Sequence, residues 1–294
     1  MEMNFIINIR IDFTMKRVMS IQDISCLGKC SLTVALPVIS CMGIETSIVP
    51  TAVLSTHTQF SNFTFRDLTD DLEAIKDHWK KEDFHFDAIY TGYLGSDRQI
   101  DIVSDYFDAF KDDKNLIIMD PAMADNGRLY AGFDENFARH MASLCSKADI
   151  ILPNISEACL MLGEEYPGED ADEASIKDLL VKLSELGAKV NVITGCCLKD
   201  NKFGFIGYNR DTRDFFSYGT EKINHKSHGT GDVFASTFTG AVVRGFSTYD
   251  ALRIAADYTC ACIKNTYNDP EHVNYAVNFE AEIPYLLKLI SEKL

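Results

Sequence analysis

The sequence lacks the cysteine and charge patterns that mark several common protein classes. Its nine cysteines are odd in number and include no Cys-x-x-Cys pair, so neither a disulfide framework nor a structural zinc site is indicated. Only 28 lysine and arginine residues stand against 44 acidic residues, and the formal net charge is -16. Because so negative a surface repels phosphate backbones and anionic lipids, nucleic acids and membranes are not expected as partners.

Long apolar runs are also missing. No stretch approaches the roughly 20 apolar residues that span a bilayer. The apolar opening has neither a basic leader nor a small-residue cleavage site, so it does not resemble a signal peptide. Because the first strand-like run starts near Arg17, we expect residues 1–14 to be an extension outside the fold and residues 15–294 to form one domain. The sequence therefore predicts a cytoplasmic protein.

Short β-rich runs and longer helical segments alternate along the chain. The apolar runs Leu116–Met119 and Ile150–Leu152 are typical of strands covered on both faces. The clearest helical segments run from Thr69 to about Lys81 and from Ser175 to Leu186. We expect Thr69 to cap the first helix, and Ser175 with Asp178 to cap the second.

This alternation predicts an α/β fold. Its main feature would be a mainly parallel central sheet with helices on both faces, joined by right-handed crossovers. Residues 202–208 and 214–218 are expected to form a late antiparallel pair. The sequence has no internal repeat, Pro/Gly-rich linker or lid-like insertion, so one domain without a large lid is expected.

Polar residues or glycines follow each predicted strand. Ordinary strand termination produces the same pattern at any single position. In an open parallel sheet, however, ligands bind beyond the carboxyl ends of the strands, and the fold would bring the whole set to one edge. These residues are Gln22 and Asp23, the segment Ser55–Thr58, the segment Thr91–Tyr93, Asp120, Asn154, and Thr194 with Gly195.

The strongest local pattern is Gly229-Thr230-Gly231-Asp232 before a predicted helix. Two glycines allow a tight turn, and the free amides of a helix N-terminus can hold an anion. The positive potential there would favour the ionised form of Asp232, ready to accept a proton. Phosphoryl transfer to an alcohol needs such an anion site and such a base. A plain glycine turn with an acidic first-turn residue would look the same, so this motif alone does not decide. It is neither a Walker A loop nor a dinucleotide fingerprint.

Asn154 and Glu157 form a second group of candidate residues. They lie three residues apart at a predicted helix start, and Asp120 follows the adjacent strand. Hard oxygen ligands of this kind suit Mg²⁺, which binds proteins through one or two carboxylates and keeps most of its waters. A simple helix-capping arrangement is the alternative interpretation.

Five motifs, in this order along the chain, resemble those of the pyridoxal/pyridoxamine kinases of the ribokinase superfamily. The resemblance extends from about Lys16 to the C-terminus. It implies a ribokinase-like fold without a large lid and a homodimeric protein. The motifs are Ser55-Thr56-His57-Thr58-Gln59-Phe60, Thr91-Gly92-Tyr93-Leu94-Gly95-Ser96, Asp120-Pro121-Ala122-Met123, Asp149-Ile150-Ile151-Leu152-Pro153-Asn154 and Gly229-Thr230-Gly231-Asp232.

The resemblance also implies an activity, namely ATP-dependent phosphorylation of the 5′-hydroxymethyl group of pyridoxal, pyridoxamine or pyridoxine. This reaction salvages vitamin B6 to pyridoxal 5′-phosphate. Asp232 would be the catalytic base, and Gly229, Thr230 and Gly231 would form the anion hole. Other positions would bind the nucleotide (Asp120, Asn154, Glu157, Thr194 and Gly195), hold Mg²⁺ directly or through water (Asp120 and Glu157), or surround the pyridine ring (Asp23, Thr58 and Tyr93).

Two departures from the family pattern leave the choice of substrate open. Asp23 stands where many members have serine, and Ala124 replaces a glycine usual after the Asp-Pro motif. A hydroxymethylpyrimidine kinase, which shares the fold, base and anion hole, is the alternative, although the motifs around His57 and Tyr93 favour vitamin B6. A silent B6-binding protein would not need the phosphoryl site, and a dehydrogenase would need a glycine fingerprint. The preferred vitamer, the oligomeric state and a requirement for a monovalent cation such as K⁺ stay open.

Overall fold

The computed structural model describes residues 15–168, 170–224, 227–273 and 275–291. The expected extension, residues 1–14, therefore lies outside the described residues. The first described strand starts at Arg17, where the sequence analysis places the start of the fold.

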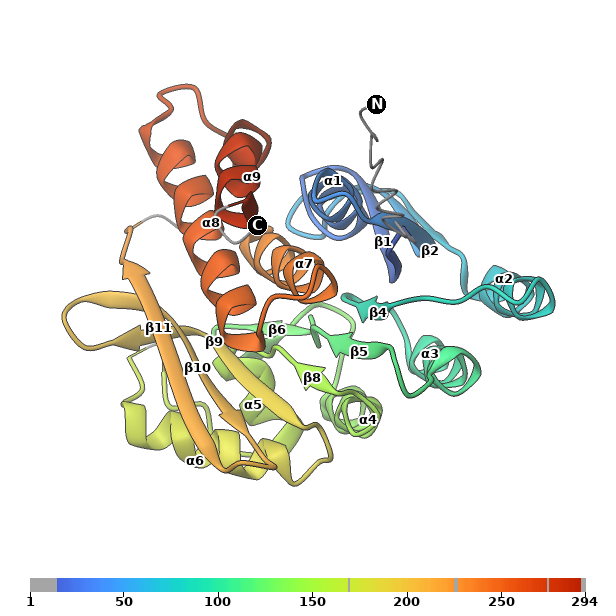
Figure 1. Ribbon diagram of the computed structural model, residues 1–294, viewed down its shortest axis with the longest axis horizontal. Helices are drawn as coiled ribbons and strands as arrows, with labels where there is room; N and C mark the ends of the chain where they lie inside the picture. The colour runs from blue at the N-terminus through green and yellow to red at the C-terminus, as the bar shows by residue number, and fades with distance from the viewer. Residues whose placement is uncertain (1–14, 169, 225–226, 274, 292–294) are drawn as a thin grey trace, which may run out of the picture.

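A mostly parallel sheet forms the centre of the molecule (Figure 1). Strands β1, β2, β4, β5, β8 and β9 pair in parallel, whereas β3, β10 and β11 add to the edges in antiparallel orientation. The predicted α/β fold is confirmed, including the late antiparallel pair. Within the described residues the nine strands run in the order β11 (Asp214–Glu221), β10 (Lys202–Asn209), β9 (Val190–Leu198), β8 (Ile150–Ile151), β5 (Leu116–Met119), β4 (Ala88–Thr91), β1 (Arg17–Leu27), β2 (Glu45–Thr56) and β3 (Phe65–Asp67).

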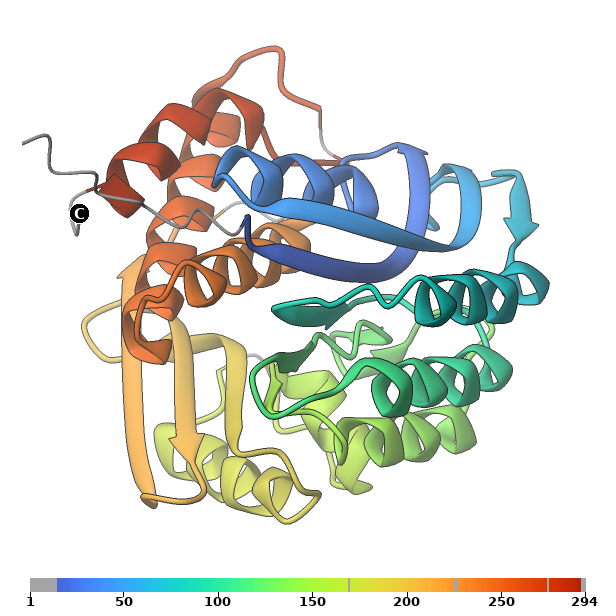
Figure 2. The ribbon, with the colours of Figure 1, turned by 45° about the vertical axis from the view of Figure 1, so that its right-hand side comes forward.

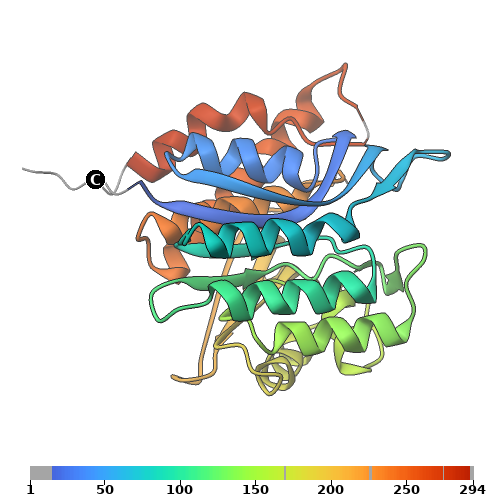
Figure 3. The same ribbon diagram turned by 90° about the vertical axis from the view of Figure 1, so that its right-hand side faces the viewer.

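Helices cover both faces of this sheet, as Figures 1 and 2 show. Figure 3 looks onto the face where α2, α3 and α4 lie side by side. Within the described residues no helix is long and apolar enough to cross a bilayer. One layer contains α1 (Leu32–Cys41), α7 (Thr230–Val243), α8 (Thr248–Asn268) and α9 (Ile283–Ser291), preceded by the short 3-10 helix η1 (Glu280–Glu282). The other contains α2 (Thr69–Lys81), α3 (Asp97–Phe110), α4 (Glu135–Cys145), α5 (Ile155–Leu162) and α6 (Glu173–Ser184).

Each helical layer packs on its own hydrophobic core. Successive side chains of a strand point to opposite faces, so Ile89 joins the core under α2 to α6, whereas Ala88 and Tyr90 join the core under α1, α7 and α8. In the same way, Ile117 joins the core under α2 to α6 and Ile118 joins the core under α1, α7 and α8. This double burial explains why the central strands read as continuous apolar runs.

Two predicted helix caps are wrong, although the bounds predicted for α2 are correct. The N-cap position of α2 is Leu68, and the Asp67 carboxylate accepts the Thr69 amide at 2.8 Å. Helix α6 begins before Ser175, because Asp172 accepts the Ser175 amide at 2.8 Å and caps the helix. In both cases an upstream aspartate supplies the acceptor that the sequence analysis assigned to a later residue.

Candidate active site

The carboxyl ends of the parallel strands meet at one edge of the sheet, next to the N-terminus of α7. The Asp120 amide donates to the Thr91 carbonyl oxygen at 2.9 Å. Asn154 forms a bridge with Thr194 on the neighbouring strand. A methyl group on Gly231 would lie 3.8 Å from Asp120 Oδ2. The structure thus brings residues from four of the predicted motifs together.

The loop before α7 has the form of an anion site. Gly229 adopts a left-handed conformation with φ of 79°, and a Cβ atom there would lie 2.3 Å from the Lys29 carbonyl oxygen, so only glycine fits. The first intrahelical hydrogen bond runs from the Val233 amide to the Gly229 carbonyl oxygen. No described side chain caps this end. The amides of Thr230 and Gly231 therefore have no intrahelical acceptor and can bind an anion.

Asp232 is half-buried in the first turn of α7. Burial raises the pKa of this carboxyl group to about 7, the Asp23 carboxylate adds to the shift, and a hydrogen bond from the Ser31 amide opposes it. The expected stabilisation of the ionised form by the helix N-terminus is therefore outweighed by burial. A base with a pKa near neutral pH can both accept a proton and release it again.

Glu157 combines a capping role with a place in the site. Its carboxylate accepts the Asn154 amide at 2.8 Å, and Asn154 Oδ1 accepts the Glu157 amide at 2.9 Å, which completes a capping box for α5. A further hydrogen bond comes from the Met123 amide at 3.1 Å. Burial nevertheless raises the pKa of Glu157 to about 8, against the effect of these amides. The capping arrangement is confirmed, and it holds the carboxylate at the strand ends.

Asp120 is the carboxylate of the site that the described residues stabilise least. It is 8% exposed, and no hydrogen bond among the described residues reaches its side chain. Burial and the charges of Glu157 and Asp232 raise its pKa well above the ordinary value. Adjacent buried carboxylates favour a cation, and their oxygen atoms suit a hard one. Among the described residues, no three His, Cys, Asp or Glu side chains are grouped to hold a metal ion.

Ala124, one of the two departures from the family pattern, lies in a short hairpin of β6 (Ala124–Asp125) and β7 (Arg128–Leu129). It is fully buried, and its carbonyl oxygen accepts Asn154 Nδ2 at 2.8 Å. The Gly127 amide in the turn donates to Ser156 Oγ at 2.8 Å. These bonds fix the hairpin to the start of α5, beside the buried carboxylates.

Gly195 interrupts the pairing of β9 with β10. Thr194 pairs with Phe205 and Cys196 with Gly204, so Gly195 is an extra residue in this strand. It forms a β-bulge with φ of 73°, a conformation that glycine adopts without strain. The bulge bends the strand where the sequence analysis places the nucleotide.

Asp23 lies within β1, and its charge acts on Asp232. It is 3% exposed, and its carboxylate accepts the Ser25 hydroxyl at 2.9 Å. Burial raises the pKa of Tyr93 to about 12, and the Asp23 charge contributes, so these two predicted residues lie near each other. Thr58 is exposed in the turn after β2, and no contact among the described residues ties it to either of them.

Two histidines next to this group were not predicted as site residues. The rings of His57 and His228 lie 4.1 Å apart between centroids. His57 Nδ1 accepts the Gln59 amide at 3.3 Å, so Nε2 carries the proton and donates to the Tyr275 carbonyl oxygen at 3.0 Å. Burial lowers both pKa values, that of His228 to about 4. His57 lies inside a quoted motif and His228 directly precedes another, but a single sequence does not show that the two rings are in contact.

The loop after β1 was also missed, although it contacts the anion site. Lys29 and Ser31 have φ values of 52° and 50°, which are unfavourable for residues other than glycine. The Ser31 hydroxyl lowers the pKa of Asp23, and its amide lowers that of Asp232. Backbone strain of this kind persists where surrounding structure enforces it, commonly at functional sites. In the sequence, only Gly28 marks this loop. The structure shows why a glycine stands there, because a Cβ atom would lie 2.3 Å from His57 Cδ2.

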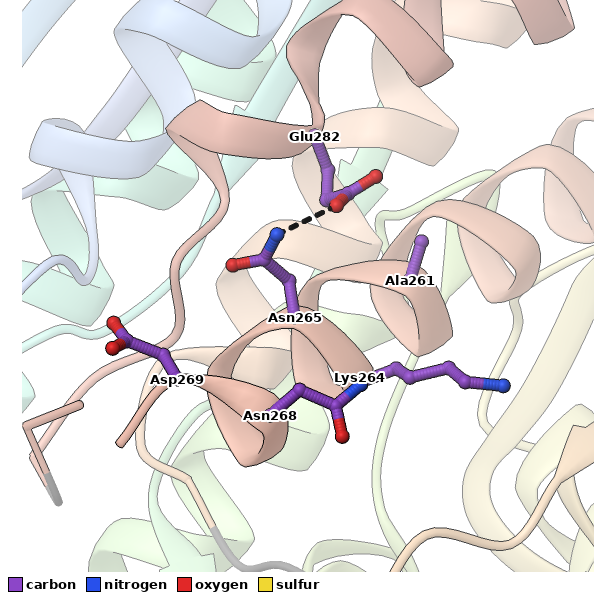
Figure 4. A pocket seen from close by; sticks show the side chains of 6 residues that line it. All are labelled: Ala261, Lys264, Asn265, Asn268, Asp269 and Glu282. Atoms are coloured by element: carbon purple, nitrogen blue, oxygen red, sulfur yellow. Dashed lines mark hydrogen bonds between the residues drawn. The ribbon is translucent and has the colours of Figure 1, made fainter. Parts of the chain in front are cut away.

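A polar pocket of about 500 Å³ lies elsewhere, between α8 and Glu282 (Figure 4). Asn265 Nδ2 donates to Glu282 Oε1 across it at 2.9 Å. Lys264 pairs with Glu221 at the end of β11 at 3.1 Å. None of the predicted site residues lines this pocket. Its lining consists of Ala261, Lys264, Asn265, Asn268, Asp269 and Glu282.

Comparisons with known proteins agree with this geometry. The family model described as phosphomethylpyrimidine kinase matches residues 36–278. A "putative phosphomethylpyrimidine kinase" from Bacteroides thetaiotaomicron is 39% identical, and the alignment covers 93% of this chain and 94% of that one with a TM-score of 0.88. A second crystal form with the same description, containing pyridoxal, is also 39% identical, with a TM-score of 0.87 and coverage of 94% and 96%.

Among the more distant relatives, some are named pyridoxal kinases and others pyrimidine kinases. A pyridoxal kinase from Lactobacillus plantarum is 27% identical, with 94% of this chain and 98% of that chain covered and a TM-score of 0.85. A hydroxymethylpyrimidine/phosphomethylpyrimidine kinase from Aquifex aeolicus is 27% identical over 198 residues, which cover 66% of this chain and 74% of the relative. The resemblance to ribokinase-like pyridoxal kinases is confirmed.

Proposed function

Because the chain belongs to the phosphomethylpyrimidine kinase family, whose activity is phosphoryl transfer to an alcohol, we propose that it phosphorylates the 5′-hydroxymethyl group of pyridoxal, pyridoxamine or pyridoxine with ATP. One observation carries this proposal. Asp232, with a pKa raised to about 7, directly follows a glycine loop whose amides have no intrahelical acceptor. A proton acceptor thus lies beside an anion site.

The reaction uses both parts of this loop. Asp232 accepts the proton of the substrate hydroxyl as the hydroxyl oxygen bonds to the γ-phosphorus of ATP. The bond between that phosphorus and the β,γ-bridging oxygen breaks, and ADP leaves with the electron pair. The amides of residues 229–231 stabilise the charge on the transferring group, which is the main task of a protein in phosphoryl transfer. Asn154, Thr194 and Gly195 are assigned to the nucleotide.

Magnesium fits the carboxylates at the ends of β5 and β8. The Asp120 carboxylate accepts no hydrogen bond from the described residues, while both Glu157 carboxylate oxygens accept backbone amides. We therefore assign Asp120 as the nearer ligand and Glu157 as a ligand through water. A bound Mg²⁺ ion neutralises phosphate charge. The same carboxylates would otherwise repel an anionic nucleotide.

Vitamin B6 is favoured as the substrate by Asp23. The buried Asp23 carboxylate, which is stabilised by the hydroxyl groups of Ser25 and Ser31, can accept a further hydrogen bond from a protonated pyridine nitrogen. The 39% identical relative crystallised with pyridoxal, matched over nearly its full length, supports the same choice. Hydroxymethylpyrimidine is the second candidate, because the family model and the Aquifex aeolicus relative carry pyrimidine kinase names.

The test is release of ADP with each of the three B6 vitamers and with hydroxymethylpyrimidine, at equal concentrations. We expect turnover with at least one vitamer and a kcat/KM for it above that for the pyrimidine. Turnover of the pyrimidine alone would replace the B6 proposal by the second candidate.

The Asp232→Asn variant tests the chemistry itself. It keeps the shape of the side chain but removes the proton acceptor, so kcat should fall by about 10²–10⁴-fold while the KM for ATP changes little. The melting temperature should hold or rise, because a buried ionisable group is lost. A folded variant that keeps more than about a tenth of wild-type kcat, far short of the usual effect of a general base, would contradict the assignment.

A further inference from the structure

A cluster of buried polar groups lies on the α7 side of the sheet, below the proposed base. Gln22, Tyr90 and Ser236 are each fully buried. Gln22 Oε1, Tyr90 Oη and Ser236 Oγ complete no hydrogen bond among the described residues. Unpaired polar atoms cost stability when buried, so three of them from three separate elements call for an explanation.

The cluster connects β1 and β4 with the helix that carries the base. Gln22 Nε2 donates to Ser20 Oγ at 3.1 Å, and Ser20 lies opposite Tyr90 in the pairing of β1 with β4. Ser236 lies four residues after Asp232 on α7, so both side chains occupy one helix face. The Ser236 hydroxyl therefore lies one turn further along α7 than the Asp232 carboxylate, near the Tyr90 hydroxyl.

Electrostatic effects also place Tyr90 beside the site. Burial raises the pKa of its hydroxyl well above the ordinary value, and the charges of Asp120 and Asp232 add to the shift. Ser236 and Gln22 oppose it, so they approach the hydroxyl even though no hydrogen bond is completed.

Neighbouring hydroxyl groups in α7 behave differently. Thr237 Oγ1 donates to the Val233 carbonyl oxygen at 2.7 Å, and Thr239 Oγ1 donates to the Ala235 carbonyl oxygen at 2.8 Å. Ser236 makes no such bond to its own helix and instead faces the sheet. Its hydroxyl is thus available to Tyr90 and Gln22.

We propose that Tyr90 and Ser236 are positioning residues for the reaction. Their buried hydroxyl groups are packed between the sheet and α7 without completing a hydrogen bond among the described residues, and their volume sets the distance of the first turn of α7 from β1 and β4 that Asp232 requires. The inference rests on the proposed phosphoryl transfer. Tyr90 and Ser236 do not touch the substrate; they act through the helix that carries Asp232. The unpaired hydroxyl groups lower the stability of the fold but keep Asp232 in position, and polar groups at functional sites commonly have such opposing effects.

The variant Tyr90→Phe removes one hydroxyl and keeps the ring. Losing an unpaired buried hydroxyl should leave the melting temperature equal to or above that of the wild type. A misplacement of 1 Å can lower a rate by about 10²-fold. A smaller shift of Asp232 should therefore lower kcat by roughly tenfold, with the KM for ATP unchanged.

Tyr106→Phe is the matched control. Tyr106 is equally buried, but its hydroxyl donates to the Leu72 carbonyl oxygen at 2.6 Å in the core on the other face of the sheet. Its loss removes this buried hydrogen bond, so the melting temperature should fall while kcat per folded molecule is unchanged. Tyr90→Phe should therefore lower kcat without lowering the melting temperature, whereas Tyr106→Phe should lower the melting temperature without lowering kcat.

Ser236→Ala completes the test. It should lower kcat by a similar factor, and the double variant with Tyr90→Phe should lose less than the product of both factors, because the two hydroxyls act together. If Tyr90→Phe gains stability and keeps wild-type kcat, the cluster is a structural defect and the inference is wrong. If Asp232→Asn is also fully active, the proposed function fails; if only Asp232→Asn is inactive, the positioning role alone fails.

Discussion

Asp23 and Asp232 are two carboxylates whose charges act on each other inside the site. The Asp23 charge raises the pKa of Asp232, while burial raises the pKa of Asp23 itself. Ser31 serves both, since its hydroxyl lowers the pKa of Asp23 and its amide lowers that of Asp232. A ligand that brings a positive group to Asp23 would therefore also change the strength of the base.

Asp23→Ser separates these two effects. Loss of the acceptor should raise the KM for the vitamer several-fold and leave the KM for ATP unchanged. Loss of the neighbouring negative charge should lower the pKa of Asp232 from about 7, so the acid limb of the kcat/KM profile should move to lower pH.

The control is Asp113→Ser, at an exposed position in the loop before β5. It removes the same charge and should change neither KM nor the pH profile. Equal effects of Asp23→Ser on both substrates would place Asp23 outside the vitamin pocket.

Single residues could be predicted from the sequence where a motif fixes them. Asp232 and Gly229 were identifiable, because a helix start after two glycines leaves few conformations. The direction of the Asp232 pKa shift was not, because it depends on how deeply the folded chain buries the carboxyl group. The contact of His57 with His228 was also beyond reach, because it joins side chains from distant parts of the chain.

At the scale of elements, the start of α5 has two roles: it caps the helix, and it positions residues of the proposed site. Its capping box positions Glu157, and the turn between β6 and β7 is bound to the same helix end. A change in Glu157 should therefore affect both the helix and the proposed Mg²⁺ site.

Glu157→Gln tests this double role. The amide keeps only one oxygen acceptor and removes the negative charge, so half-maximal rate should require several-fold more Mg²⁺. The control is Asp172→Asn at the cap of α6, which should leave the Mg²⁺ titration unchanged. An unaltered titration for Glu157→Gln would leave Glu157 with a capping role only.

Helices and strands could be predicted where the spacing of apolar residues in the sequence matches the face that the fold buries. The bounds of β5 and α2 match the prediction, since an apolar run and an amphipathic pattern mark them. The hairpin of β6 and β7 and the bulge at Gly195 were not predicted. Their strands are too short, or their irregularity too local, to leave a periodic pattern.

For the whole molecule, the buried carboxylates make stability depend on pH. The pKa values of Asp232 and Glu157 are raised to about 7 and about 8. The folded chain therefore holds these protons more tightly than the unfolded chain does. The free energy of unfolding should fall as pH rises from the ordinary carboxyl pKa of about 4 to these raised values.

The measurement is thermal unfolding between about pH 5 and pH 8 without ligand, the interval in which the folded chain holds protons that the unfolded chain has lost. We expect the melting temperature to fall across this interval, and Asp232→Asn and Glu157→Gln to flatten the change. Added salt should alter the slope little, because buried charges are poorly screened. A wild-type melting temperature that stays constant or rises across the interval would contradict the expected shifts.

The close packing of Gly229 on the Lys29 carbonyl oxygen also matters during synthesis of the protein. It joins a loop near the beginning of the chain to one near its end, so the anion site does not exist until α7 has left the ribosome. ATP cannot stabilise an earlier intermediate, because a ligand stabilises only a state that binds it. The first strands must therefore persist, or be protected by chaperones, until the last quarter of the chain arrives.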